Sequence, residues 1–302
     1  MRYRVVHITR YQYSGEVSLS HNQMRLLPRL LDYQLIEHRH ISIVPEPTFQ
    51  QSWVDPFGNR TQFFSIEHSH REMVVHAESL IDRQTPSYAD SCRFSWEEIA
   101  SKIARPPAQD DREAAQFAFD SYYTGSFEKA RAYAAPCFTT GRNIVEAVGE
   151  LTAKIFDEFE YDPQATQIST PTNEVLELRR GVCQDFAHLQ IACLRSMGLA
   201  ARYVSGYLLT HAPAGKEKLI GSDASHAWIS VYVGNGNWLD FDPTNNVRPA
   251  EEHITIGWGR DYADICPIQG VLIGGGGQTV LTVSVDVRQI DDIITPQAST
   301  QT

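Results

Sequence analysis

Three residues far apart in the chain have the types and the order of a thiol-based catalytic group. Cys183 would supply the nucleophile, His226 the ring that transfers a proton, and Asp242 the carboxylate that orients the ring. They are separated by 43 and 16 residues. A nucleophile, a base and an orienting acid in line allow a side chain to attack a carbonyl carbon. The sequence therefore predicts acyl transfer through a thioester.

The sequence around Cys183 predicts that this thiol lies at the start of a helix. Gly181 precedes it, and apolar residues then recur at helical spacing until Gly198, which is expected just beyond the helix end. The unpaired N–H groups and the dipole at a helix start favour a thiolate and stabilise an oxyanion. A lone cysteine is more often a small buried hydrophobic residue. Cys193, on the predicted buried stripe of the same helix, is interpreted in that way.

His226 and Asp242 are predicted to lie on the two strands of one hairpin. Residues 225–233 and 238–244 have strand-like patterns. The Gly-Asn-Gly-Asn segment between them is a strong signal for a hairpin turn. The histidine would begin the first strand and the aspartate would end the second.

The register of this hairpin decides which side chain orients His226. An ideal two-residue turn pairs His226 with Asn245 and leaves Asp242 roughly 10 Å along the strand. Either the turn is longer and bulged, or the amide of Asn245 orients the imidazole. Asp240, two residues before Asp242 on the same face, is a weaker competitor.

Further polar residues near these segments are candidates for the substrate cleft. Asp185 and His188 follow the cysteine on its helix but point away from it, and are interpreted as structural anchors. The backbone N–H of Cys183 is one expected oxyanion donor, and nothing assigns a second donor to Gln164 or Gln167. The cleft candidates precede the histidine, follow the aspartate or lie in the segment beyond: Asp223, Ser225, Asn245, Arg260 and Tyr262.

The chain that must position these residues divides into a β part and a mixed part. Residues 1 to about 90 alternate short apolar runs with turns, the clearest being Asp-Pro-Phe-Gly-Asn, and predict a sheet with one wet face. Between residues 95 and 160 the pattern is helical. No regular pattern is found from 250 to 274, and residues 279–287 predict a final strand.

The composition and charge exclude several classes of function. The 302 residues include 26 basic and 37 acidic side chains, a formal charge of −11, so neither nucleic acid nor a membrane is an expected partner. No segment has the apolar length of a signal peptide core or a membrane span. The five cysteines are widely spaced, which disfavours disulfides and a zinc site and indicates a cytoplasmic location. We expect no metal and no cofactor.

Three blocks of the sequence resemble the core of the bacterial transglutaminase-like superfamily. They are GVCQDFAHLQIACLRSMGLAARYVSGYL (181–208), DASHAWISVYV (223–233) and WLDFDPTN (238–245). Three other segments resemble the β-domain and the tail found in one bacterial branch of the family: HITRYQYSGEVSLSHNQMRLLPR (7–29), DPFGN (55–59) and GRDYADICPIQGVLIGGGG (259–277). Together the segments cover nearly the whole chain.

This resemblance implies an α+β fold, in which an N-terminal antiparallel β-domain precedes a papain-like, transglutaminase-like core. In that core a helix carrying the cysteine packs on an antiparallel sheet carrying the histidine and the aspartate. The family's aspartate corresponds here to Asp242, which favours it over Asn245. The expected divisions are a β-domain at 1–92, a helical segment at 93–160, the catalytic core with the C-terminal strand at 161–290, and a polar tail at 291–302.

The resemblance implies a mechanism more than a substrate, because the family includes peptide hydrolysis, deamidation and acyl transfer to amines. We expect a cysteine peptidase or amidase that acts on a protein or peptide. An acceptor amine must outcompete water, which requires a dry second-substrate site, and none is identified. The alternatives are a cross-linking protein-glutamine amine acyltransferase and a non-catalytic binding module that retains the fold. The sequence leaves the oligomeric state open.

Overall fold

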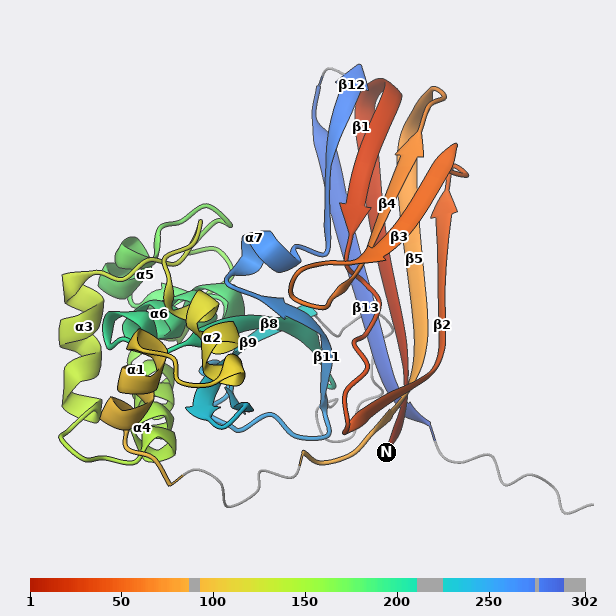
Figure 1. Cartoon of the computed structure of the whole chain (residues 1–302). Coiled ribbons are helices and arrows are strands. Elements are labelled where there is room, and N and C mark those ends of the chain that lie inside the picture. Colours follow the sequence, from red (N-terminus) through yellow and green to blue (C-terminus); the bar gives the residue numbers. More distant parts are fainter. Residues whose placement is uncertain (87–92, 211–224, 275–276, 291–302) are drawn as a thin grey trace, which may run out of the picture.

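The computed structural model describes residues 1–86, 93–210, 225–274 and 277–290. In Figure 1 a large upright β-sheet stands beside a mixed part that contains the helices and a smaller sheet. The large sheet takes strands from both ends of the described chain. The fold is therefore α+β, with an N-terminal antiparallel β-domain and a core of helices on an antiparallel sheet, which confirms the predicted class.

The β-domain is a seven-stranded sheet built around one long strand, β1. Side chains of β1 alternate between buried and more exposed positions along its 23 residues, as expected of a sheet with one covered face. The strand order is β2-β5-β1-β4-β3, and β12 and β13 also pair with β1. The bounds are β1 (Arg2–Met24), β2 (Gln34–Val44), β3 (Phe49–Val54), β4 (Arg60–Ile66), β5 (His70–Arg83), β12 (Ile268–Gly274) and β13 (Thr279–Ile290).

The last two strands of the described chain pair with the first. β13 runs antiparallel to residues 2–13 of β1, and β12 continues alongside residues 17–24. The C-terminal strand is expected from the sequence to belong to the catalytic core, whereas the structure places it in the N-terminal sheet. An apolar alternation fits any sheet with one covered face, so the pattern predicts a strand but does not identify its partner.

The turn between β3 and β4 also attaches the β-domain to the core. Asp55 Oδ1 accepts the backbone N–H groups of Phe57 and Asn59 at 3.0 and 2.9 Å, and Gly58 has a φ of +80°, as the turn pattern predicts. The Asn59 side chain donates to the Trp258 carbonyl at 2.7 Å and accepts from the Trp258 N–H at 3.0 Å. This turn therefore attaches the β-domain to strand β11 (His253–Gly259) of the core.

The core consists of helices packed on a four-stranded antiparallel sheet, whose order is β10-β9-β8-β11. Its strands are β8 (Ala201–Leu208), β9 (Ser225–Gly234), β10 (Asn237–Phe241) and β11 (His253–Gly259), and a separate parallel pair is formed by β6 (Glu160–Tyr161) and β7 (Arg180–Gly181). Its helices are α1 (Trp96–Ala104), α2 (Gln109–Ala115), α3 (Glu128–Ala134), α4 (Ile144–Glu158), α5 (Thr172–Leu178), α6 (Cys183–Ser196) and α7 (Tyr262–Ile265), with short 3-10 turns at Gln116–Ala118 and Ala135–Cys137. Within the described ranges, no helix is long and apolar enough to cross a membrane.

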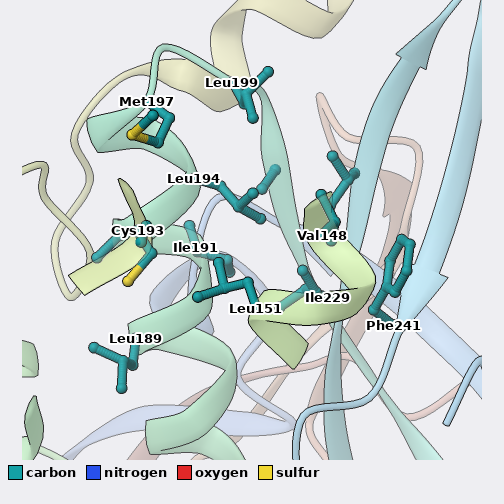
Figure 2. Close-up of a cluster of buried hydrophobic side chains, with 14 of the residues drawn as sticks. Val148, Leu151, Leu189, Ile191, Cys193, Leu194, Met197, Leu199, Ile229 and Phe241 are labelled. Atoms are coloured by element: carbon teal, nitrogen blue, oxygen red, sulfur yellow. The ribbon is translucent and has the colours of Figure 1, made fainter. Parts of the chain in front are cut away.

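Helix α6 lies at the centre of the core. It begins at Cys183, as predicted, and every residue from Asp185 to Ser196 is buried. The sequence predicts only one buried stripe along this helix, but more of its surface is buried, because α3, α4 and α5 cover the sides of α6 that do not face β8 and β9. Figure 2 shows Leu194 of α6, Leu151 of α4 and Ile229 of β9 in one apolar cluster. Such close packing fixes the position of the first residue of the helix.

The β-domain and the core share a buried apolar interface. Tyr3, Val5 and Ile81 of the large sheet pack with Tyr207 and Ile254 of the small one. This contact joins β1 and β5 to the edge of the core sheet, near the ends of β8 and β11. The β-domain therefore packs directly against the sheet that carries His226.

The prediction of irregular chain between 250 and 274 was wrong. The segment forms β11, α7 and β12. Figure 1 shows β11 between the core helices and the large sheet. Its residues are buried almost throughout, and the polar–apolar alternation of its sequence is limited to the short His-Ile-Thr-Ile stretch before two glycines.

Candidate active site

Cys183 opens helix α6 directly after a short parallel pair of strands. Tyr161 of β6 pairs with Gly181 of β7, which fixes the backbone just before the cysteine. Gly181 is buried, and a Cβ at this position would lie 2.6 Å from a carboxylate oxygen of Asp185. Glycine is therefore required where the chain enters the helix.

Asp185 holds the start of this helix. Its Oδ2 accepts the N–H of Val182 at 2.9 Å and the hydroxyl of Thr166 at 2.6 Å. Burial raises the pKa of Asp185, although both hydrogen bonds oppose the shift. These contacts are those of a capping residue, in agreement with the interpretation of Asp185 as a structural anchor.

A one-residue bulge places His226 and Asp242 on the same face of the core sheet. The register of β9 and β10 shifts by one residue next to the turn, at Asn237. When the register is continued along both strands, His226 aligns with Thr244 instead of Asn245. Because residues two apart on a strand share a face, Asp242 then lies on the face of His226. Of the two alternatives drawn from the sequence, the bulged turn is the one observed.

The structure brings Cys183, His226 and Asp242 together. His226 Nε2 is 2.7 Å from Asp242 Oδ2, and the Asp242 side chain is completely buried. An ionised carboxylate only accepts hydrogen bonds, so Nε2 carries a proton and Nδ1 is the nitrogen left for the sulfur. Burial lowers the pKa of His226, but hydrogen bonds to Asp242 and Cys183 and the charges of both groups outweigh it and raise the pKa to about 10. The contacts of His226 therefore favour the imidazolium form of this ring beside the thiol.

Asp242 receives several hydrogen bonds besides the one from His226. The Asn245 amide donates to Oδ2 at 2.7 Å, the Thr244 N–H donates to Oδ1 at 2.9 Å, and His253 Nε2 donates to Oδ2 at 3.1 Å. Burial raises the pKa of Asp242, but the hydrogen bonds from His226 and His253 hold the pKa well below its usual range. Asn245 therefore supports the carboxylate and does not replace it.

His253 is a residue of this site that was not predicted from the sequence. It begins β11, in the segment predicted to be irregular. The short His-Ile-Thr-Ile alternation was the signal for a strand there. Asp240, the weaker competitor for His226, accepts the indole N–H of Trp228 at 3.0 Å.

The cleft candidates close to His226 have different positions. Asp223 lies outside the described residues. Ser225 is exposed at the first position of β9, directly before the histidine.

The two glutamines considered as oxyanion donors lie in the loop before α5. The backbone N–H of Gln164 donates to the Asp162 side chain and that of Gln167 to the Thr170 hydroxyl, at 2.9 Å in both cases.

The two remaining candidates, Arg260 and Tyr262, are engaged in contacts around α7. Arg260 forms an ion pair with Asp264 at 2.8 Å. The N–H of Tyr262 donates to His188 Nε2 at 3.1 Å. Burial lowers the pKa of His188 to about 4, so its ring is neutral and can accept this hydrogen bond. His188 thus anchors α7 to α6.

The donors around Asp242 are also those of a possible metal site. Within the part of the chain that the structure describes, one ligand atom each of His226, Asp242 and His253 lie within 4.8 Å of one another. A zinc ion would have to replace the protons on both Nε2 atoms. The distances of 2.7 and 3.1 Å from these nitrogens to Oδ2 are those of hydrogen bonds, which already satisfy the three side chains.

A cavity of about 700 Å³ opens beside the starts of α3 and α5. Its walls include the rings of Tyr122, Tyr123 and Phe127, and they do not include Cys183. The Tyr123 ring stacks on His188, at 5.5 Å between ring centroids. The site is therefore defined by the hydrogen-bonded group at the start of α6, and not by this cavity.

The contribution of His226 to stability is expected to fall as the pH rises above about 6.5. Its pKa is raised from 6.5 to about 10 in the folded protein, so its stabilising effect is complete below pH 6.5 and is lost as the pH approaches 10. The loss amounts to at most ~1.4 kcal/mol per pH unit. The contribution of Asp242 to stability depends on pH in the opposite direction. Because the pKa of Asp242 is lowered in the folded protein, this contribution is lost on acidification.

Urea unfolding across this pH range provides the measurement. The wild type should lose free energy of unfolding with rising pH more steeply than His226→Gln. His40→Gln, at an exposed position of β2, is the matched control and should retain the wild-type slope. Equal slopes in all three proteins would contradict the assignment of the raised pKa.

Models of two protein families match the chain. The bacterial transglutaminase-like N-terminal region matches residues 3–82, and the transglutaminase-like superfamily model matches residues 131–243. An uncharacterised protein of Mycobacterium tuberculosis is 40% identical over 295 residues, which cover 95% of this chain and 92% of the relative. A protein-glutamine gamma-glutamyltransferase of Pseudomonas aeruginosa is 30% identical over 107 residues, which cover 33% of this chain and 16% of that protein.

A solved structure has a similar arrangement of elements. It is described as that of a putative cysteine protease from Cytophaga hutchinsonii, and it matches with a TM-score of 0.75, covering 98% of this chain and 93% of that one. The two chains are 23% identical, so the likeness concerns the fold alone.

Proposed function

The chain belongs to the transglutaminase-like superfamily, and from that premise we propose that it is a cysteine peptidase or amidase. Cys183 is the proposed nucleophile, His226 the proton donor and acceptor, and Asp242 the group that orients His226. The expected substrate is a protein or peptide that presents an amide bond or a glutamine side chain.

One observation supports this proposal above the others. A thiol at the start of a buried helix contacts an imidazole, whose other nitrogen is 2.7 Å from a completely buried carboxylate. A thiol that contacts an imidazole at the start of a helix is the arrangement found around cysteine nucleophiles. Thiolate and imidazolium are the starting states that a cysteine hydrolase needs.

The proposed reaction begins with attack of the Cys183 thiolate on the carbonyl carbon. The oxyanion that forms is stabilised by backbone N–H groups in the first turn of α6, including that of Cys183, because such groups lack partners within the helix. The carbon–nitrogen bond then breaks, and the Nδ1 proton of His226 goes to the departing amine or ammonia. A thioester and a neutral imidazole remain.

Water completes the proposed cycle. His226, now neutral, takes a proton from a water molecule while the oxygen of that water attacks the thioester carbon. The carbon–sulfur bond breaks, releasing the carboxylic acid and restoring the thiolate and the imidazolium. Asp242 remains ionised throughout and stabilises the charged ring.

Hydrolysis is expected to exceed transfer to an amine. A glutamine peptide would be incubated with the protein, with and without a primary amine, and the products would be followed by mass spectrometry. We expect the acid product in both mixtures, because an acceptor amine needs a site that excludes water. Predominance of the amine adduct would instead support the cross-linking alternative. Cys183→Ala should form neither product.

Amine transfer is the second candidate because of one comparison. The Pseudomonas aeruginosa relative is named a protein-glutamine gamma-glutamyltransferase, and it shares 30% identity over 107 residues. The chain spans 16% of that protein, so its activity is carried over only as this alternative.

A further inference from the structure

Asp242 holds a second imidazole that the proposed reaction does not use. Its Oδ2 accepts from His226 Nε2 at 2.7 Å, from the Asn245 amide at 2.7 Å and from His253 Nε2 at 3.1 Å. The carboxylate is completely buried, so the side chains around it determine its orientation. Two rings therefore share one oxygen of the group that orients the proton donor.

The ring of His253 is fixed by its neighbours. It is buried, and it meets the Trp228 ring edge-on at 5.3 Å between centroids. It also lies 5.9 Å from the ring of His226. The indole N–H of Trp228 donates to Asp240, which fixes the tryptophan in turn. A donor held in this way is suited to hold the carboxylate that accepts from it.

The backbone of His253 is attached to the β-domain. Arg83, the last residue of β5, is 1% exposed and donates from Nε to the His253 carbonyl at 2.8 Å. A second Arg83 nitrogen donates to the Ala250 carbonyl at 3.1 Å. The Arg83 guanidinium also lies over the Tyr33 ring, at 4.4 Å. One arginine of the large sheet thus holds the segment that delivers His253 to the core.

We propose that His253 is a positioning residue for Asp242, and that Arg83 places it, so that the β-domain sets the geometry of the active site. This inference rests on the proposed function, because it assigns His253 a task in the same reaction. His253 acts through Asp242 and does not touch the substrate. The β-domain thereby acquires a role in catalysis.

The chemical consequence concerns the proton on His226. Each donor to Asp242 reduces the negative charge that the carboxylate presents to His226. Loss of the His253 donor would make His226 hold its proton more tightly and release it less readily to the leaving group. The ionisable groups around this contact are His226, Asp242, Cys183 beyond the ring of His226, Asp240 through Trp228, and Arg83 at the backbone.

The test compares His253→Phe, which keeps a ring against Trp228 but removes the donor, with His253→Gln, whose amide can still donate. His253→Phe should lower kcat by about 10- to 100-fold with little change in KM. In His253→Phe the alkaline limb of the pH–rate profile should move to higher pH. His253→Gln should recover most of the activity. Arg83→Lys should change kcat and the pH profile in the same direction, to a smaller extent. His40→Phe, at an exposed position in β2, is the matched control and should behave as wild type.

A second readout separates this proposal from the proposed function. The His226 ring can be titrated by NMR without any substrate, and its pKa should rise further in His253→Phe. If the pKa rises while the wild type hydrolyses no amide, the proposed function fails and the coupling of His253 to His226 remains. If His253→Phe is folded and neither kcat nor the titration changes, the positioning role is wrong. Thermal unfolding of each variant identifies effects that come from stability alone.

Discussion

Replacement of Cys183 by alanine is expected to reduce hydrolysis by about 10⁴-fold or more, since removal of the nucleophile leaves only the binding and oxyanion contributions. The fold should persist, because Cys183 is only partly buried at the start of α6. Initial rates on a glutamine peptide, together with circular dichroism, provide the measurement. Retention of more than a tenth of the wild-type rate would contradict the assignment of the nucleophile.

Cys266→Ala is the matched control for this replacement. Cys266 is also a partly buried free cysteine, and its thiol donates to the Ile268 carbonyl at 3.3 Å. Burial raises the pKa of Cys266, so it is not expected to be reactive. Iodoacetamide should therefore label the wild type and Cys266→Ala rapidly and Cys183→Ala slowly. Slow labelling of Cys183 in the wild type would favour the non-catalytic module.

Replacement of Asp242 by asparagine is expected to lower kcat by roughly 10²- to 10⁴-fold. An amide oxygen accepts fewer hydrogen bonds than a carboxylate, and the amide nitrogen would face N–H donors in either orientation. In place of Oδ2 it would face the side chains of His226, His253 and Asn245, and in place of Oδ1 the backbone N–H groups of Thr244 and Asn245. The negative charge that raises the pKa of His226 would also be lost. The alkaline limb of the pH–rate profile should therefore move down from about pH 10.

Asp240→Asn provides the matched control, since this carboxylate is buried two residues away on the same chain segment. Its partner is the indole N–H of Trp228, to which an amide oxygen can also bond. Asp240→Asn should retain most of the activity and an unchanged pH profile. Equal losses in the two variants would show that any buried carboxylate in this region matters and would remove the special role of Asp242.

The start of α6 was predictable because its signals are local. Gly181, the apolar spacing and Gly198 act within the helix and its ends, and the structure begins the helix at Cys183 and gives Gly198 a φ of +78°. The strands that carry His226 and Asp242 were predictable from their alternation for the same reason. Burial of α6 on all sides was not, because it depends on helices that pack against it from elsewhere in the chain.

The register that places Asp242 on the same face of the sheet as His226 could not be derived from the local sequence pattern. One extra residue near Asn237 moves Asp242 to the other face of the sheet, and a bulge has no reliable sequence signal. His253 was missed because the His-Ile-Thr-Ile alternation in β11 is short and both faces of this strand are buried. The contact of Arg83 with the His253 carbonyl joins residues from different domains, and no periodicity reports such a contact.

The pairing of β12 and β13 with β1 has a consequence for the order in which the parts of the molecule fold. During synthesis these strands follow the whole core, so one edge of β1 keeps unpaired backbone groups until β12 and β13 have been made. The N-terminal strands therefore emerge first but finish their sheet last. The contact of Arg83 with the His253 carbonyl likewise forms only after Cys183, His226 and Asp242 have been synthesised, because His253 follows all three in the chain, so the β-domain reaches the reactive centre late in folding.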